Sequence, residues 1–187
     1  NHFRFFVSGG AYLSPQLGNF WEEMGFRVIQ GYGATECAPI IAANPMHDHN
    51  LQSVGKPLPG VEVRIASDQE ILVSGPNVAL GYWKDPEMTD LSFRAGWYYT
   101  GDLGHIDEHG NLYLKGRKKN LIVLANGMNV YPEDIENILQ RSPDIKEAVI
   151  IGLMEGNSGP DVHAILLMEH PEKAKSLIQQ TNKQLAS

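Results

Sequence analysis

The sequence has a single cysteine and fewer basic than acidic residues. Cys37 has no partner for an intrachain disulfide, which favours a reducing compartment, and we expect a cytoplasmic protein. Lysine and arginine total 15 against 22 aspartates and glutamates, giving a formal net charge of −7. Nucleic acids and anionic membranes attract clustered cations, so this balance argues against either as the main partner.

Long apolar runs are also absent. No run approaches the roughly 20 residues that a bilayer span requires, and no basic segment followed by an apolar one marks a secretory signal. An apolar fraction of 42% and a charged fraction of 20% are typical of a globular protein. The sequence starts at Asn1 without a methionine, so we expect a piece of a longer protein, for which membrane association is possible but not encoded here. Nothing in the sequence indicates an oligomeric state.

Four short blocks combine glycine with hydroxyl, carboxylate, aromatic or basic side chains. They are residues 8–11, 30–36, 98–103 and 116–119. Glycine lets the backbone approach a ligand closely, and the side chains offer groups that recognise phosphate, ribose, metal or base. Because strand-like segments separate the blocks, they predict a site assembled from several loops, with a nucleoside triphosphate as ligand.

Each block also has an ordinary structural interpretation. In residues 31–36 (GYGATE), Thr35 offers a hydroxyl to phosphate and Glu36 a hard oxygen ligand to Mg²⁺, but the segment also suits a tight turn before a helix. Asp102 suits the two hydroxyls of a ribose, and a β-turn equally well. Arg117 with its neighbouring lysines suits a solvated charge run or a hinge.

Two further candidates are weak. Residues 47–49 (HDH) suggest a metal site, but no further ligands follow at zinc-like spacing, so we do not expect one. Cys37 has no basic neighbour in sequence to activate its thiol, and we expect a small packed residue.

The pattern of turns and apolar residues predicts an α/β beginning. We expect a buried strand over 3–7, a helix capped by Ser14 and ended by Gly25, and a strand over 27–30 that stops before the loop 31–33. Leu17, Phe20, Trp21 and Met24 form one apolar stripe of that helix.

The remainder predicts a small β region and then an α+β segment. Expected strands cover 61–65, 71–74, 78–83, 97–100 and 112–114, with a helix opened at Asp85 and ended by Gly96, and a hairpin turn at 108–111. Beyond the basic stretch 116–120 we expect strands over 121–124, 148–153 and 163–168, a helix over 132–141, and another beginning near Pro171. The predicted domains are residues 1–116, divided into an α/β portion (1–53) and a β-sheet or barrel subdomain (54–116), and a small α+β domain, 117–187.

Taken together, the blocks resemble the adenylate-forming superfamily, which includes acyl-CoA synthetases, adenylation domains of peptide synthetases and luciferases. The matching stretches are residues 31–36, 70–89, 98–103 and 116–136. The last (GRKKNLIVLANGMNVYPEDIE) is most similar to AMP-forming long-chain fatty-acid–CoA ligases. The resemblance implies activation of a carboxylate by Mg-ATP to an acyl-adenylate and pyrophosphate, followed by acyl transfer to coenzyme A.

The resemblance also implies roles for particular residues. Tyr32 would stack on adenine, in a base pocket lined by Gly9, Gly10 and Ala11. Gly33 and Thr35 would lie near phosphate. Asp102 and Arg117 would bind the ribose. Glu36 would hold Mg²⁺. Lys119 would be the pivot of a rotating C-terminal domain, and Gly127 would lie in a loop that enters the site for thioester formation.

Two parts of the family pattern are missing. The Ser/Thr/Gly-rich phosphate loop has no counterpart, and the lysines after Met168 lie in a glycine-free, helix-like tail rather than in a Gly-Lys context. We therefore expect a C-terminal fragment with negligible adenylation activity alone. The alternatives are a non-catalytic nucleotide-binding or interaction module with the same fold, and an adenylation domain for another carboxylic acid.

Overall fold

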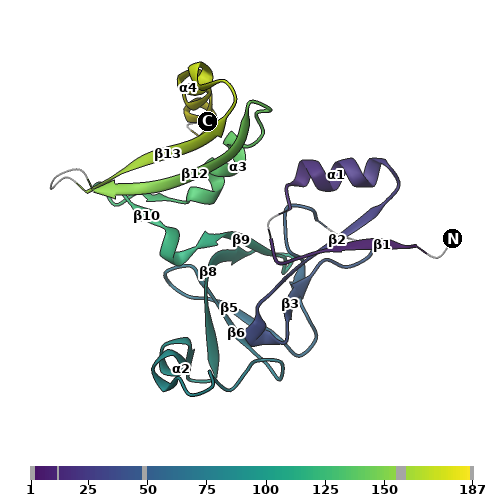
Figure 1. Cartoon of the computed structure of the whole chain (residues 1–187). Helices are drawn as coiled ribbons and strands as arrows, with labels where there is room; N and C mark the ends of the chain where they lie inside the picture. The colour runs from purple at the N-terminus through teal and green to yellow at the C-terminus, as the bar shows by residue number, and fades with distance from the viewer. Residues whose placement is uncertain (1–2, 12, 48–49, 155–158, 186–187) are drawn as a thin grey trace. The chain divides into compact units, whose positions relative to one another are not determined.

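The chain divides into two compact units, Asn1–Leu114 and Lys115–Ser187 (Figure 1). The computed structural model describes residues 3–11, 13–47, 50–154 and 159–185. Within these residues, no helix combines the length and the apolar character needed to cross a bilayer. The predicted mixture of α/β and α+β structure is confirmed.

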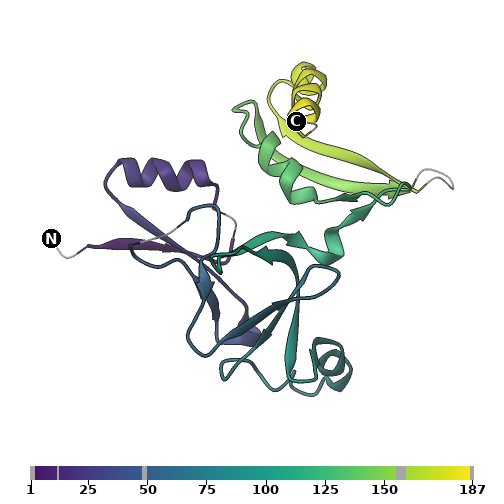
Figure 2. The same ribbon diagram turned by 180° about the vertical axis from the view of Figure 1, so that it is seen from behind.

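The first unit opens with a four-stranded sheet of order β1-β2-β3-β4. Its elements are β1 (Phe5–Ser8), α1 (Pro15–Glu23), β2 (Arg27–Gly33), the 3₁₀ turn η1 (Thr35–Cys37), β3 (Ile40–Ala43) and β4 (Lys56–Pro57). β1 and β2 are parallel, and the other pairs are antiparallel. Both Figure 1 and Figure 2 show α1 alongside β2.

Local capping fixes the limits of α1. The N–H of Leu17 donates to the Ser14 side-chain oxygen at 3.2 Å, and Pro15 occupies the first turn, where its missing N–H costs nothing. The helix ends at Glu23, and Gly25 follows with a φ of 85°, which a glycine adopts without strain. The predicted start and end of this helix are confirmed.

The predicted burial of the first strand is wrong. β1 runs over Phe5–Ser8, and Val7 is 70% exposed. Of the predicted helical stripe, Leu17 and Phe20 are also exposed. β2 is the strand that pairs with β1 in the described sheet, so β1 lies at its edge.

The second sheet of this unit has the order β5-β6-β8-β7, and β9 also pairs with β8. Its elements are β5 (Glu62–Ile65), β6 (Glu70–Ser74), α2 (Pro86–Ser92), β7 (Phe93–Arg94), β8 (Trp97–Ile106) and β9 (Leu112–Arg117). Residues 78–83 were predicted as a strand but form a loop closed by an isolated bridge between Tyr82 and Asp85. Asp85 caps α2 as predicted, but α2 ends at Ser92 rather than at Gly96 because the chain enters β7.

One apolar core joins the two sheets. Its fully buried members include Cys37, Ile41, Ile71 and Leu112, which come from both sheets and the turn between β2 and β3. Burial first and the nearby Glu36 charge second raise the pKa of the Cys37 thiol to about 11, so the thiolate is disfavoured. Cys37 is therefore a packed residue, as predicted.

Asp107 closes the turn between β8 and β9. Its carboxylate accepts hydrogen bonds from the Asn111 backbone N–H at 2.7 Å, the Asn111 side-chain amide at 2.9 Å and the His109 N–H at 2.9 Å. These bonds, the Asn111 side chain first among them, lower the pKa of Asp107 to about 2, although burial acts in the opposite direction.

We expect Asp107→Ala to destabilise the protein in a pH-dependent way. The folded pKa lies below the usual 3.8, so ionised Asp107 stabilises the fold above about pH 4, and this contribution disappears as the pH falls to about 2. Urea unfolding should show a deficit in the variant at pH 7 that shrinks below pH 4. Glu108→Gln, in the same turn and well exposed, is the matched control. A deficit that does not change with pH would contradict this prediction.

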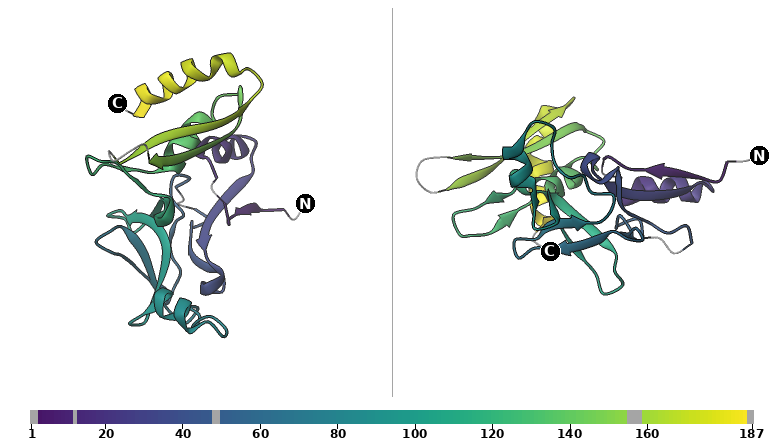
Figure 3. Two further views of the ribbon diagram at one scale, coloured as in Figure 1. Left: turned by 60° about the vertical axis from the view of Figure 1, so that its left-hand side comes forward. Right: turned by 90° about the horizontal axis from the view of Figure 1, so that it is seen from below.

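The second unit packs two helices against a long β hairpin (Figure 3). Its elements are η2 (Lys118–Asn120), β10 (Ile122–Val123), β11 (Asn129–Val130), α3 (Pro132–Leu139), β12 (Ile145–Met154), β13 (Pro160–Met168), η3 (Pro171–Lys173) and α4 (Ala174–Leu185). Leu139 of α3 and Leu177 of α4 contact a core that includes Ile145 and Ile150 of β12. Tyr131 precedes α3 without a capping side-chain bond.

Candidate functional site

The predicted loop 31–33 is wrong, since these residues lie inside a strand, and the strand predicted over 97–100 is present but continues to Ile106. Residues 31–33 complete β2, where Gly31 pairs with Ala43 of β3, and residues 98–103 belong to β8. A strand fixes the direction of each side chain more firmly than a loop does. The candidate site of the first unit is therefore built largely on sheet residues.

Tyr32 and Asp102 meet although 70 residues separate them. The Tyr32 hydroxyl donates to Asp102 Oδ2 at 2.6 Å, which joins β2 to β8. Burial raises the pKa of Tyr32 above its ordinary value, and Asp102 raises it further, so the phenol keeps its proton and acts as the donor. Because Tyr32 is only 7% exposed, stacking of its ring on adenine stays a prediction.

The glycine block after β1 lies against β2. Ser8 of β1 pairs with Gln30 of β2. A Cβ atom added at Gly9 would lie 3.4 Å from the carbonyl oxygen of Gly31. Gly9, like Gly10 and Ala11, is exposed. The structure therefore brings the first block beside the backbone that carries Tyr32, and its role in a base pocket stays a prediction.

Gly33 stands where the chain leaves β2. A Cβ at this position would lie 1.9 Å from the carbonyl oxygen of Pro39, an overlap that backbone atoms cannot relieve cheaply. The Ala34 N–H donates to the same oxygen at 2.9 Å, and the register of β2 against β3 shifts between Tyr32 and Gly33. Glycine is therefore required here for close packing, whether or not a phosphate approaches it.

Thr35 and Glu36 form a single 3₁₀ turn rather than the start of an α-helix. Thr35 is exposed, whereas Glu36 is half-buried and accepts a hydrogen bond from the Tyr82 hydroxyl at 2.7 Å. Burial raises the pKa of Tyr98 above its usual range, with Glu36 adding to the effect, so this hydroxyl also stays protonated near the carboxylate.

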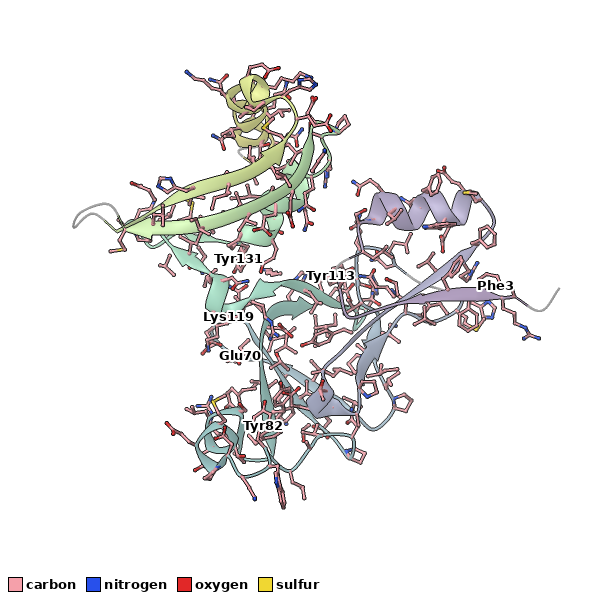
Figure 4. All side chains as sticks on the ribbon, viewed as in Figure 1. Phe3, Glu70, Tyr82, Tyr113, Lys119 and Tyr131 are labelled. Carbon is pink, nitrogen blue, oxygen red and sulfur yellow. The ribbon has the colours of Figure 1, made fainter. Side chains whose placement is uncertain are left out.

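Aromatic packing orients the tyrosines that face Glu36. The ring of Phe93 packs on both, with its centroid 5.5 Å from that of Tyr82 and 5.0 Å from that of Tyr98. The Tyr82 N–H donates to the Thr89 hydroxyl at 2.9 Å, which ties this tyrosine to α2. Figure 4 labels Tyr82 close to that helix. Tyr82 lies in a stretch that resembles the superfamily, but no sequence pattern showed that it reaches Glu36.

Glu36 is a single carboxylate, which limits the kind of metal site that it can form. Among the described residues, no group of three or more histidine, cysteine, aspartate or glutamate side chains gathers to hold an ion. Mg²⁺ is commonly held by one or two carboxylates together with the phosphates of its substrate and water, so Glu36 alone fits that mode. Of the HDH motif at 47–49, Asp48 and His49 lie outside the described residues.

The other predicted residues lie in the second unit. Arg117 and Lys119 are exposed, and the Arg117 N–H donates to Glu133 Oε1 at 3.4 Å, an oxygen that also accepts from the Asn120 amide at 2.9 Å. Glu133 of α3 therefore anchors η2, the basic turn that contains Lys119 (Figure 4). This local anchoring is compatible with a hinge, and the pivot role stays a prediction.

Gly127 lies at the exposed tip between β10 and β11. Its N–H donates to the Leu124 carbonyl at 2.8 Å, and the Leu124 N–H donates to the Met128 carbonyl at 2.9 Å. The strand predicted over 121–124 is shorter than expected, since β10 covers only Ile122–Val123 and pairs with β11 across this turn. The entry of this turn into a reaction site stays a prediction.

Two models of one enzyme family match most of the chain. Residues 1–83 match the family described as AMP-binding enzyme, and residues 119–186 match the AMP-binding enzyme C-terminal domain. The chain therefore belongs to the AMP-binding enzyme family.

Similar proteins agree with that assignment. The chain is 40% identical over 177 residues to the long-chain-fatty-acid–CoA ligase FadD15 of Mycobacterium bovis, covering 95% of this chain and 29% of that protein. o-Succinylbenzoate CoA synthetase (MenE) of Bacillus subtilis, in complex with the acyl-adenylate OSB-AMP, is 33% identical with a TM-score of 0.89 over 97% of this chain and 39% of MenE. MenE with ATP and magnesium gives 32% identity and a TM-score of 0.85, over 95% and 40% of the two chains. The chain thus spans less than half the length of these proteins.

Proposed function

We propose that the complete protein is an AMP-forming ligase that activates a carboxylic acid with ATP and then transfers the acyl group to coenzyme A. The observation that carries the proposal is the convergence of Tyr32 and Asp102, two residues of the predicted nucleotide site, in a chain whose relatives are acid–CoA ligases. Glu36, held by tyrosine hydroxyls in the same unit, supplies the carboxylate that a phosphate-bound metal needs.

Each residue then has a chemical task. Asp102 accepts hydrogen bonds from the ribose hydroxyls, and the Tyr32 hydroxyl keeps its carboxylate in one orientation. Thr35 donates its hydroxyl to a phosphate oxygen, and Glu36 holds the metal. Mg²⁺, when bound, offsets the repulsion between an anionic carboxylate and the phosphates it approaches. Arg117 adds a second contact to the ribose, and the second unit rotates about Lys119 between the two half-reactions.

The acid that fits best is a long-chain fatty acid. Support comes from the 40% identity with a long-chain-fatty-acid–CoA ligase over almost the whole of this chain. MenE, an o-succinylbenzoate CoA synthetase, matches the fold of this chain with a TM-score of 0.89, so an aromatic or dicarboxylic acid is the specific alternative.

Acid-dependent release of pyrophosphate tests the proposal. The complete protein, given ATP, Mg²⁺ and a panel of acids, should release pyrophosphate fastest with long-chain fatty acids and form the acyl-CoA when coenzyme A is added. Residues 1–187 alone should show negligible release in the same assay. AMP binding without acid-dependent release from the complete protein would contradict the proposed ligase, and preference for an aromatic acid would contradict the proposed substrate.

A further inference from the structure

β8 carries a bulge at the point where it presents Asp102. Glu70 of β6 pairs with Leu103 of β8, and Leu72 pairs with Tyr99. Between these two pairs β6 advances by two residues and β8 by four, so β8 holds two extra residues around Gly101. A bulge of this kind redirects a side chain and interrupts the ladder of backbone hydrogen bonds.

Gly101 provides the backbone conformation that the bulge needs. Its φ is 71°, in the left-handed region that other residues enter only with strain. Two N–H groups, those of Gly101 and Asp102, bond to side chains here. A half-buried N–H without an acceptor would favour a different backbone conformation, which would move the Asp102 side chain. The acceptors of these two N–H groups therefore determine how firmly the Asp102 carboxylate is held.

Side chains replace the missing ladder bonds. The Gly101 N–H donates to Glu70 Oε1 at 3.0 Å, and the Asp102 N–H donates to the Thr100 hydroxyl oxygen at 3.0 Å. That hydroxyl in turn donates to the Ile71 carbonyl of β6 at 2.8 Å. Glu70 of the neighbouring strand β6 and Thr100 of β8 itself thus brace the two consecutive N–H groups of the bulge.

Both side chains that hold the bulge are buried. Glu70 and Thr100 are each 5% exposed, and a carboxylate is rarely buried to this extent unless its bonds hold it there. The preceding turn also fixes Glu70, since the Ala66 N–H donates to the Glu70 carbonyl at 2.9 Å. Figure 4 labels Glu70 on β6 beside β8.

We propose that Glu70 is a positioning residue for nucleotide binding: its carboxylate, together with the Thr100 hydroxyl, holds the β8 bulge that sets Asp102 against the ribose. Glu70 does not touch the nucleotide and acts only through Asp102. The inference rests on the proposed role of Asp102 as the ribose acceptor. It therefore predicts a loss confined to ligands whose ribose carries hydroxyl groups.

Binding of AMP and of 2′,3′-dideoxyAMP to the complete protein, measured by calorimetry, separates positioning from general damage. Glu70→Ala should weaken AMP about 10-fold and change the affinity for the dideoxy nucleotide less than 2-fold. Glu70→Gln keeps an acceptor oxygen for the Gly101 N–H and should restore AMP affinity to within about 3-fold of the native value. Glu62→Ala, an exposed glutamate of β5 in the same sheet, is the matched control and should change neither affinity.

Two further variants keep the inference testable if Glu70→Ala does not fold. Thr100→Val removes the other brace and should show the same AMP-selective loss. Glu70→Ala combined with Asp102→Ala should bind AMP no more weakly than Asp102→Ala alone, because the two residues act in series. Equal losses for both nucleotides, or no loss from Glu70→Ala and Thr100→Val, would overturn the positioning role. A native protein that binds both nucleotides alike would overturn the ribose contact itself.

Discussion

Replacing Asp102 with alanine is expected to weaken AMP binding by about 10- to 100-fold. Hydrogen bonds to a charged group contribute roughly 1.5–3 kcal/mol, and each 1.4 kcal/mol is about tenfold in affinity. The substitution also leaves the buried Tyr32 hydroxyl without the acceptor that lies 2.6 Å away. We therefore expect an additional loss of stability of about 1–3 kcal/mol.

Calorimetry for AMP and urea unfolding measure these two effects separately. Asp102→Asn keeps an oxygen for Tyr32 while removing the charge, so it should recover stability but only part of the affinity. Tyr32→Phe removes the other partner and leaves the carboxylate in place, so its loss of affinity should be the smaller. Native-like AMP affinity in a folded Asp102→Ala protein would show that Asp102 does not bind the ribose.

Glu36→Gln is expected to lower the rate of acid-dependent pyrophosphate release by about 100- to 1,000-fold. The amide is a poorer ligand for Mg²⁺ than a carboxylate, and removing one fixed electrostatic contact to a reacting phosphate has effects of this order. The loss should be partly relieved at high Mg²⁺ concentration. AMP affinity measured without Mg²⁺ should change less than about 2-fold, because only the metal contact has been altered.

The tyrosine that holds Glu36 supplies a graded comparison. Tyr82→Phe keeps the ring that packs on Phe93 and removes only the hydroxyl that donates to Glu36, so it should raise the Mg²⁺ requirement less than Glu36→Gln does. Glu87→Gln, an exposed acid of α2, is the control for a simple change in charge. A Glu36→Gln protein with a native Mg²⁺ dependence would remove Glu36 from the metal site.

Local signals predicted the elements whose limits depend on a few neighbouring residues. The Ser14 cap and Gly25 fixed α1, and Asp85 fixed the start of α2, because capping satisfies backbone groups within one turn of the chain. The end of α2 was mispredicted, since pairing of Phe93 with Tyr98 decides it. The glycines in residues 31–33 led to the wrong prediction of a loop. The segment is a strand because it pairs with β3, and the sequence does not show that pairing.

The sequence by itself determined the family, the candidate residues and the approximate positions of the α-helices, because these depend on residue types and on their spacing along the chain. Only the tertiary structure decided that Tyr32 bonds to Asp102, that Tyr82 reaches Glu36, and that Glu70 braces the bulge. Each of these contacts joins residues more than 30 positions apart. They exist because a shared apolar core packs the two sheets together, and no local periodicity records which strands become neighbours.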